Sequence, residues 1–211
     1  MRGAAPGYSP GSSSVHPGSL TGFAGGAGYG GAVRPLGSLV PRPVLDHLDL
    51  VGEPVADALR CWPRADEVGV VEIDPELADT AAMSEAYGVP LEVSANCVVV
   101  AGVRAGDERV AACVVRADTR ADVNNLVRRT LDVRKASFLP MDRAVQESAM
   151  AYGGITPVGL PSRWRLLVDS RCVDLEVAVV GSGVRGSKLL LAGAALADLP
   201  GAEVVEGLGR A

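Results

Sequence analysis

The chain has 211 residues, a formal net charge of −5 and 48% hydrophobic residues. This length accommodates one domain of ordinary size together with a tail. The acidic balance argues against a protein that wraps DNA or RNA through many phosphate contacts, because such proteins are normally basic. It still allows a small site with a local basic cluster.

Residues 1–40 are rich in glycine, serine and proline and contain no acidic residue. Too few large apolar side chains are available there to offset chain entropy, so we predict a disordered tail over residues 1–40 and one domain over residues 41–211. The first 30 residues lack the continuous apolar run of a secretory signal, and no segment is long enough to span a bilayer. We therefore expect a cytoplasmic protein with no membrane partner.

Cysteine and histidine usage narrows the chemistry. The four cysteines are widely spaced and form no C-x-x-C pair, which argues against a zinc site or a disulfide framework. The two histidines, His16 and His47, are too few and too close to the N-terminus to favour a histidine-dependent triad. No metal and no organic cofactor are expected.

The first half of the expected domain alternates helices and strands. Apolar residues at helical spacing predict a helix within residues 41–62, and a β-branched run predicts a strand over residues 68–73. Asp74 is expected to cap a second helix that runs to Tyr87, before the glycine at position 88.

A β-hairpin is predicted next, from the apolar runs 98–103 and 110–115. These runs are continuous rather than alternating, so we expect both faces of the hairpin to be covered. A helix over residues 121–131 follows, capped by Asp118 or Thr119.

The second half continues in the same mixed manner. Its expected elements are a strand over 136–139, a helix over 142–151, strands over 166–168, 173–180 and 188–191, a helix over 194–199 and a strand over 203–205. Strands grouped in hairpins with interspersed helices are typical of an α+β fold.

The loop over residues 153–161 (GGITPVGLP) contains three glycines and two prolines. Glycine permits a positive φ and close approach of a ligand to the backbone, and proline fixes the neighbouring geometry. Such a loop suits the presentation of backbone N–H groups to an oxygen that gains negative charge. A purely structural turn is the alternative interpretation.

Five segments between about Val71 and Gly207 together resemble the YbaK/prolyl-tRNA editing-domain family. In the family's order they are residues 96–102 (NCVVVAG), 109–116 (RVAACVVR), 121–131, the loop 153–161 with 167–170 (LVDS), and 179–189 (VVGSGVRGSKL). The resemblance implies a mixed, mostly antiparallel, barrel-like sheet surrounded by helices. It also implies hydrolysis of mischarged aminoacyl-tRNA, with the aminoacylated 3′ end as partner and an aminoacyl-tRNA synthetase as a further candidate.

The resemblance implies a pocket between the loop, the start of the strand at residue 96 and the turn over residues 181–188. The catalytic candidates are Asn96, Gly153, Gly154, Ile155 and Thr156. Backbone amides of the loop would stabilise the oxyanion, and the hydroxyl of Thr156 would either orient water or stabilise the turn. The expected substrate-binding residues are Pro157, Gly159, Asp169, Gly181, Ser182, Gly183, Arg185 and Lys188. For Asp169, binding an amino group and ending its strand are equal alternatives.

Asn96 departs from the family, whose best-known members carry lysine at this position. Asparagine offers neutral donors and an acceptor in place of a cation. It would hydrogen-bond the ribose or the α-amino group, or else only satisfy the strand edge. The leading hypothesis is therefore a trans-acting enzyme that hydrolyses the ester of misacylated tRNA, in which the substrate's own ribose hydroxyl helps to activate water. The alternatives are a non-catalytic module that binds aminoacyl-tRNA or a synthetase, and hydrolysis of another acyl ester or amide.

Overall fold

The computed structural model describes Met1 and residues 34–211. Most of the predicted tail, residues 2–33, lies outside the described residues. The predicted boundary after residue 40 differs from the structure, because Leu36 and Leu39 exchange backbone hydrogen bonds of 3.0 Å and Leu39 is buried. Leu39 packs in a cluster with Met83 and Val89. The folded part therefore begins a few residues earlier than expected.

The described chain contains six α-helices, eleven strands and six short helical segments. The α-helices are α1 (Glu53–Cys61), α2 (Thr80–Tyr87), α3 (Arg128–Thr130), α4 (Met141–Ser148), α5 (Ser170–Val173) and α6 (Gly193–Ala197). The strands are β1 (Arg42–Pro43), β2 (Gly69–Glu72), β3 (Ala95–Arg104), β4 (Asp107–Arg116), β5 (Arg120–Ala121), β6 (Ala136–Phe138), β7 (Arg165–Asp169), β8 (Ala178–Gly181), β9 (Ser187–Leu191), β10 (Ala202–Val205) and β11 (Gly209–Arg210). The short segments are η1 (Val44–Asp46), η2 (Leu48–Leu50), η3 (Ala65–Glu67), η4 (Pro75–Leu77), η5 (Leu91–Val93) and the π-helical η6 (Val123–Val127).

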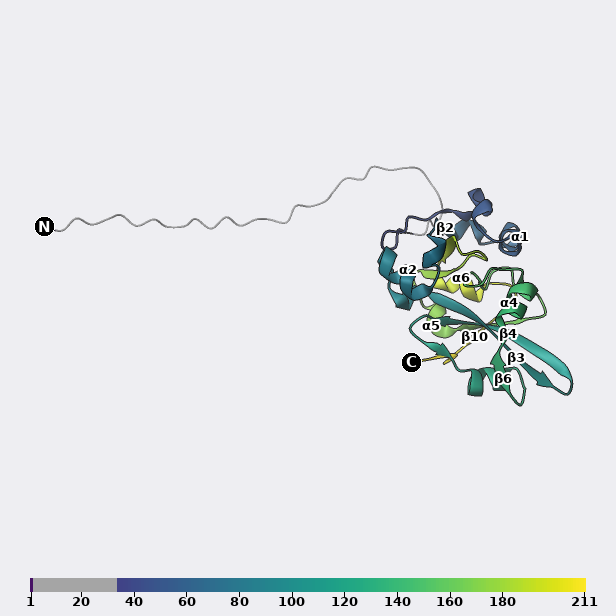
Figure 1. Ribbon diagram of the computed structural model, residues 1–211. Helices are drawn as coiled ribbons and strands as arrows, with labels where there is room; N and C mark the ends of the chain where they lie inside the picture. The colour runs from purple at the N-terminus through teal and green to yellow at the C-terminus, as the bar shows by residue number, and fades with distance from the viewer. Residues whose placement is uncertain (2–33) are drawn as a thin grey trace.

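The strands form two large sheets and one small one (Figure 1). The four-stranded sheet has the order β1-β2-β9-β8 and is antiparallel throughout. The five-stranded sheet has the order β10-β7-β4-β3-β6, with parallel pairing of β7 to both β10 and β4. This confirms the α+β fold with mixed, mostly antiparallel pairing. In the described part of the chain the strands do not close into a barrel.

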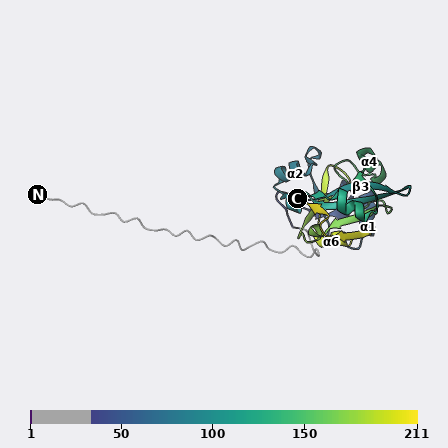
Figure 2. The same ribbon diagram turned by 90° about the horizontal axis from the view of Figure 1, so that it is seen from below.

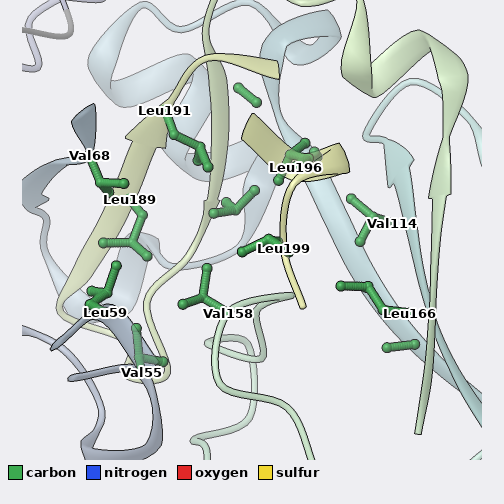
Figure 3. Close-up of a cluster of buried hydrophobic side chains, with 14 of the residues drawn as sticks. Val55, Leu59, Val68, Val114, Val158, Leu166, Leu189, Leu191, Leu196 and Leu199 are labelled. Atoms are coloured by element: carbon green, nitrogen blue, oxygen red, sulfur yellow. The ribbon is translucent and has the colours of Figure 1, made fainter. Parts of the chain in front are cut away.

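The main hydrophobic core lies between the two large sheets (Figure 3). Leu189 and Leu191 of β9 enter it from one side, and Val114 of β4 enters it from the other, with Leu196 of α6 between them. All four side chains are fully buried. Burial of one such side chain is worth about 1.5–3 kcal/mol, so this core joins the sheets into one unit.

The hairpin β3–β4 is covered on both faces, as its continuous apolar runs predicted. Ala112 and Val114 face the main core, whereas Ala111, Cys113 and Val115 face a second core. Successive side chains of a strand point to opposite faces, so a strand buried on both sides has no polar positions. Seen from below, β3 lies between α2 and α4 at the top of the view and α6 at the bottom (Figure 2).

Three predicted elements differ from the structure. Asp74 caps only the short segment η4, and α2 is a separate helix that is capped by Asp79. The helical segment after the hairpin is capped by Asp122, whose carboxylate accepts hydrogen bonds from the amides of Asn125 and Leu126, both at 3.3 Å. The caps proposed from the sequence are therefore wrong: Asp118 pairs with Arg116, and Thr119 donates to the carbonyl of Arg116 at 2.8 Å. Residues 173–177 are also not a strand, because α5 follows β7 directly and β8 starts only at Ala178.

Candidate functional site

A cavity of about 420 Å³ opens between the start of β3, the loop after α4 and the turn from β8 to β9. It brings together six residues that were predicted for the site: Asn96, Gly153, Ile155, Gly181, Arg185 and Lys188. The start of β3, the loop after α4 and the β8–β9 turn, which lie far apart along the chain, were the three segments expected to form the pocket. The remaining lining residues were not predicted; among them are Asp79 and Thr80 at the start of α2, Cys97, and Tyr152.

The loop at residue 153 is bound to the β8–β9 turn through the backbone. The amide of Gly183 donates to the carbonyl of Gly154 at 2.8 Å, and the amide of Ala151 donates to the carbonyl of Gly183 at 2.8 Å. Gly153 has a φ of 77°, which favours glycine, whereas Gly154 is required for a different reason. A Cβ atom at Gly154 would lie 2.6 Å from the carbonyl oxygen of Val184. Gly153 is therefore needed for its backbone conformation, and Gly154 is needed because no side chain fits there.

The backbone amides of the loop differ in whether they are hydrogen-bonded within the described part of the chain. The amide of Gly154 donates to the carbonyl of Ala151 at 2.9 Å and is used by the turn itself. The amides of Gly153 and Ile155, by contrast, have no acceptor among the described residues, and both residues line the cavity. N–H groups of this kind suit an oxygen that gains negative charge.

Thr156 does not line this cavity. The side chain is fully buried, and its hydroxyl has no hydrogen-bond partner among the described residues. Neither role expected for the Thr156 side chain is supported by this position, because the residue does not line the cavity and its hydroxyl makes no hydrogen bond to the turn among the described residues.

Asn96 occupies the cavity wall at the start of β3, where it is partly buried. Its side-chain oxygen accepts a hydrogen bond of 2.8 Å from the hydroxyl of Thr80, the first residue of α2. An asparagine amide also carries two N–H donors, and these have no acceptor among the described residues. Asn96 is therefore held by α2 with its donors left for a ligand.

Lys188 and Arg185 place positive charge at two depths of the cavity. Lys188 is 6% exposed, and its Nζ donates to the carbonyl of Ala78 at 3.0 Å. Burial, helped by the charge of Arg185 and opposed by Asp79, holds the pKa of Lys188 below its ordinary value. Arg185 is more exposed and donates to the carbonyls of Pro75 at 2.8 Å and Tyr152 at 3.4 Å. The Arg185 guanidinium therefore lies at the outer edge of the cavity, between Pro75 and Tyr152.

Ser182 and Gly183 shape the turn behind the cavity rather than lining it. Ser182 is fully buried, and its hydroxyl donates to the carbonyl of Ser187 at 2.9 Å. Gly183 has a φ of 85°, and a Cβ atom there would lie 2.9 Å from the side chain of Val55. Direct substrate binding through these two residues is therefore not supported by their positions.

Pro157 and Gly159 line a different cavity of about 460 Å³, near the end of α1. This cavity is bordered by Trp62 and Trp164 and does not include the Gly153 region. Gly159 has a φ of 80°, and a Cβ atom there would lie 2.3 Å from the carbonyl oxygen of Pro54. The second half of the loop therefore packs on α1, and Pro157 and Gly159 do not line the cavity around Asn96.

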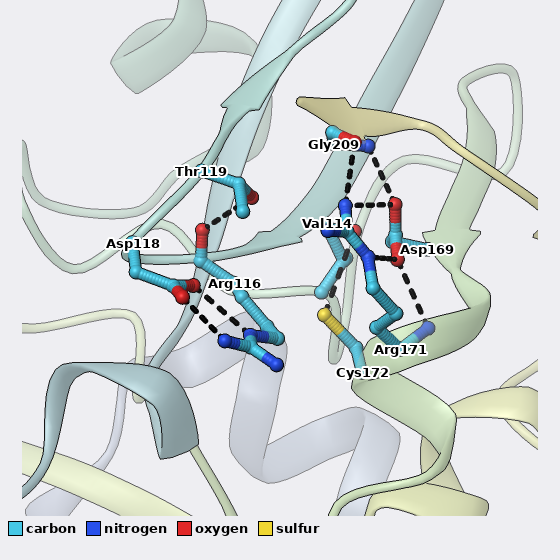
Figure 4. A network of polar contacts seen from close by, with 8 residues as sticks. All are labelled: Val114, Arg116, Asp118, Thr119, Asp169, Arg171, Cys172 and Gly209. Atoms are coloured by element: carbon cyan, nitrogen blue, oxygen red, sulfur yellow. Dashed lines mark hydrogen bonds and ion pairs between the residues drawn. The ribbon is translucent and has the colours of Figure 1, made fainter. Parts of the chain in front are cut away.

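Asp169 is a structural residue (Figure 4). Its carboxylate is fully buried, caps α5 through the amide of Arg171 at 2.9 Å, and accepts from the guanidinium of Arg171 at 3.0 and 3.2 Å. It also accepts from the amide of Gly209 in β11. Burial alone would raise the pKa of Asp169, but these hydrogen bonds outweigh burial and hold the pKa below its usual value. The prediction that Asp169 binds substrate is wrong, and the strand-ending alternative fits.

Among Met1 and residues 34–211, no group of three or more histidine, cysteine, aspartate or glutamate side chains is placed to hold a metal ion. Over the same residues no helix combines the length and the apolar character needed to cross a membrane. The cavity around Asn96 is lined by backbone amides, one carboxamide, the cations of Arg185 and Lys188 and the carboxylate of Asp79. Donors of this kind suit an oxygen-rich group.

Comparison with known proteins identifies the family. The sequence model of a family described as "Aminoacyl-tRNA editing domain" matches residues 74–199, which is more than half of the chain. The chain belongs to the aminoacyl-tRNA editing domain family. The matched range includes every residue that lines the cavity around Asn96.

Solved structures share the fold. One protein, described as hypothetical, has a TM-score of 0.66 and 19% identity over 75% of this chain and 100% of its own. A second, described as a candidate trans-editing enzyme for prolyl tRNA synthetase, has a TM-score of 0.64 and 18% identity over 75% of this chain and 96% of its own. A candidate signal transduction protein from Marinobacter aquaeolei has a TM-score of 0.51 and 16% identity, over 75% of this chain and 30% of its own. At these identities the likeness concerns the fold alone.

Proposed function

We propose that this protein is a trans-acting deacylase that hydrolyses the ester bond between an amino acid and the 3′-terminal ribose of misacylated tRNA. One observation carries the proposal: Gly153, Ile155, Asn96 and Lys188 all line one cavity, and within the described residues the amides of Gly153 and Ile155 and the side-chain donors of Asn96 have no acceptor. That cavity lies within the range matched by the editing family.

The reaction needs little from side chains, because an aminoacyl ester is already activated. Water adds to the ester carbonyl carbon, and the carbonyl electron pair moves onto oxygen. The amides of Gly153 and Ile155 bind that oxygen as its negative charge grows. The bond to the ribose oxygen then breaks, and a proton from the attacking water ends on that oxygen. The products are the free amino acid and tRNA with an intact terminal ribose.

The remaining groups orient the substrate. The neighbouring ribose hydroxyl helps to activate water, and the Asn96 amide donates to the ribose or to the acyl group. We assign Arg185 at the rim to the phosphate of the terminal nucleotide, since a guanidinium binds phosphate well. A net charge of −5 fits a protein that holds only this end of tRNA. We also propose that the protein is cytoplasmic and that an aminoacyl-tRNA synthetase is a further partner.

A non-catalytic binding module is the second candidate, favoured by one observation. Position 96 offers only neutral groups where the resembled family carries a cation. Such a module would bind aminoacyl-tRNA through the same cavity without hydrolysing it.

The proposal is tested by incubating the purified full chain with a panel of tRNAs, each charged with a cognate or a non-cognate labelled amino acid. We expect release of label from at least one mischarged tRNA at a rate well above spontaneous hydrolysis. Binding of mischarged tRNA without release of label would favour the binding module. Neither binding nor release would contradict both candidates.

A further inference from the structure

Lys188 is an unusual residue for a protein interior. It is one of only two lysines in the chain, and its side chain is almost completely buried in β9 at the cavity wall. Its Nζ has one hydrogen bond, to the carbonyl of Ala78 at 3.0 Å. An ammonium group carries three donors, so two remain. All 25 acidic side chains lie in the described part of the chain, and none of them lies within ion-pair distance of Lys188.

The charges that face Lys188 come from two other elements. Arg185 opposes its charge from the rim, and Asp79 favours its charge from the start of α2. The Asp79 carboxylate accepts from the amide of Ala81 at 3.0 Å and so serves α2 as its N-cap. Cys97 stays a neutral thiol, because burial raises its pKa far above the ordinary value. Lys188 is thus the inner cation of the cavity, with no compensating carboxylate in contact.

We propose that Lys188 binds the carbonyl oxygen of the substrate ester and stabilises the negative charge that develops on it during hydrolysis. The inference rests on the proposed deacylase function. Asn96 on the facing strand offers only neutral groups, so the positive charge inside the cavity comes from β9. A buried cation stabilises a developing oxyanion more than an exposed one does, because less water screens the interaction.

Lys188 and Arg185 lie at different depths in the cavity, so we expect them to contact different parts of the substrate. Lys188 lies in the wall, where the acyl group would enter, whereas Arg185 lies at the more exposed rim. In the reaction the Lys188 ammonium remains protonated and donates a hydrogen bond, so no proton is transferred from it. Removal of Lys188 should therefore lower kcat, and removal of Arg185 should mainly raise KM.

The competing explanation is that Lys188 only supports the carbonyl of Ala78. The variant Lys188→Met, whose side chain has a similar length but no charge, distinguishes this support role from a role in catalysis. A support role predicts a clear loss of thermal stability with normal turnover. Our inference predicts a Tm within a few degrees of wild type, because burying an uncompensated charge is costly, together with a fall in kcat of about 10²–10³-fold. Lys135→Met is the matched control, since Lys135 is exposed and lies outside this cavity.

Two further readouts make the test specific. Activity that depends on the ammonium is lost as pH rises through its lowered pKa, and Lys188→Arg should move this alkaline limb upward while it retains part of kcat. With only two lysines, amine labelling followed by mass spectrometry reports each one separately. A non-hydrolysable aminoacyl-adenosine amide should protect Lys188 from labelling and leave Lys135 unchanged.

The decisive experiment measures kcat, KM and Tm of wild type, Lys188→Met, Lys188→Arg and Lys135→Met on one mischarged tRNA. A folded Lys188→Met protein with wild-type kcat overturns this inference and leaves the deacylase proposal standing. A wild-type protein that is inert on every mischarged tRNA overturns both. Loss of kcat in Lys188→Met alone, with protection of Lys188 by the amide analogue, supports the inference.

Discussion

Thr80 donates its hydroxyl hydrogen to the side-chain oxygen of Asn96 across 2.8 Å. This bond joins the first turn of α2 to the start of β3 and holds the Asn96 carboxamide, whose N–H donors have no acceptor within residues 34–211. Position 96, where the resembled family carries a lysine, therefore holds a neutral hydrogen-bond donor in a fixed orientation.

Asn96→Ala should weaken hydrolysis without unfolding the protein. The variant loses one or two neutral hydrogen bonds to substrate, each worth roughly 0.5–1.5 kcal/mol, so kcat/KM should fall about three- to two-hundredfold. Thr80→Val keeps the Asn96 side chain and removes only its anchor, so a smaller fall is expected. Steady-state kinetics on a mischarged tRNA measure both. Unchanged kinetics in a folded Asn96→Ala protein would remove Asn96 from the site.

Gly154→Ala should destabilise the fold. The new Cβ atom would lie 2.6 Å from the carbonyl oxygen of Val184, and overpacking of this kind costs about 1–3 kcal/mol. Gly186→Ala is the matched control, because its Cβ atom would lie no closer than 3.7 Å to the side chain of Pro75. Thermal denaturation compares the two. Equal Tm values for Gly154→Ala and wild type would show that the loop does not pack on the turn as described.

Asp169→Ala should lower stability at neutral pH by about 2–3 kcal/mol, less than for a fully buried pair because Arg171 is partly exposed. The pKa of Asp169 is depressed in the folded state, so its contribution is present above the ordinary aspartate pKa and is lost as pH falls through the lower, folded value. Urea unfolding of both proteins along an acid series checks this. A difference between them that grows toward low pH would have the wrong sign.

Truncation should locate the start of the domain. Removal of residues 1–33 should leave Tm unchanged, whereas removal of residues 1–40 should lower it, because Leu39 is buried against Met83 and Val89. Leu39→Ala in the full chain should cost about 2–5 kcal/mol by the same contacts. Differential scanning calorimetry of the two truncated proteins and of Leu39→Ala, each compared with wild type, measures these changes in Tm. A wild-type Tm after removal of residues 1–40 would show that Leu39 contributes nothing.

Much of the fold followed from local pattern in the sequence. The runs around Val99 and Val114 predicted a hairpin buried on both faces, since a strand with apolar residues at every position has no solvent side. The order of the family-like segments also predicted three walls of the cavity. The hairpin depends on neighbouring residues, which sequence patterns describe well, whereas the cavity walls come from distant segments and were predicted only by the resemblance to the family.

The misassigned caps Asp118 and Thr119 are local errors, since both bind Arg116. Other errors concern partners that are distant along the chain. Asp169 binds the nearby Arg171 and also accepts from the amide of Gly209, forty residues away, and nothing at position 169 indicates the distant partner. Pro157 and Gly159 continue the same loop as Gly153, yet they pack on α1 and line another cavity. Thr80 gave no signal either, because a threonine at the start of a helix is common. Tertiary contacts, rather than local propensity, decided each of these positions.

The central claim is that the cavity around Asn96 hydrolyses mischarged tRNA. The most direct measurement is single-turnover release of labelled amino acid from a mischarged tRNA panel by wild type, Asn96→Ala and Asn96→Lys. Our account predicts clear hydrolysis by wild type and weaker hydrolysis by Asn96→Ala. An inert wild type beside an active Asn96→Lys variant would contradict it and identify the natural protein as a binding module.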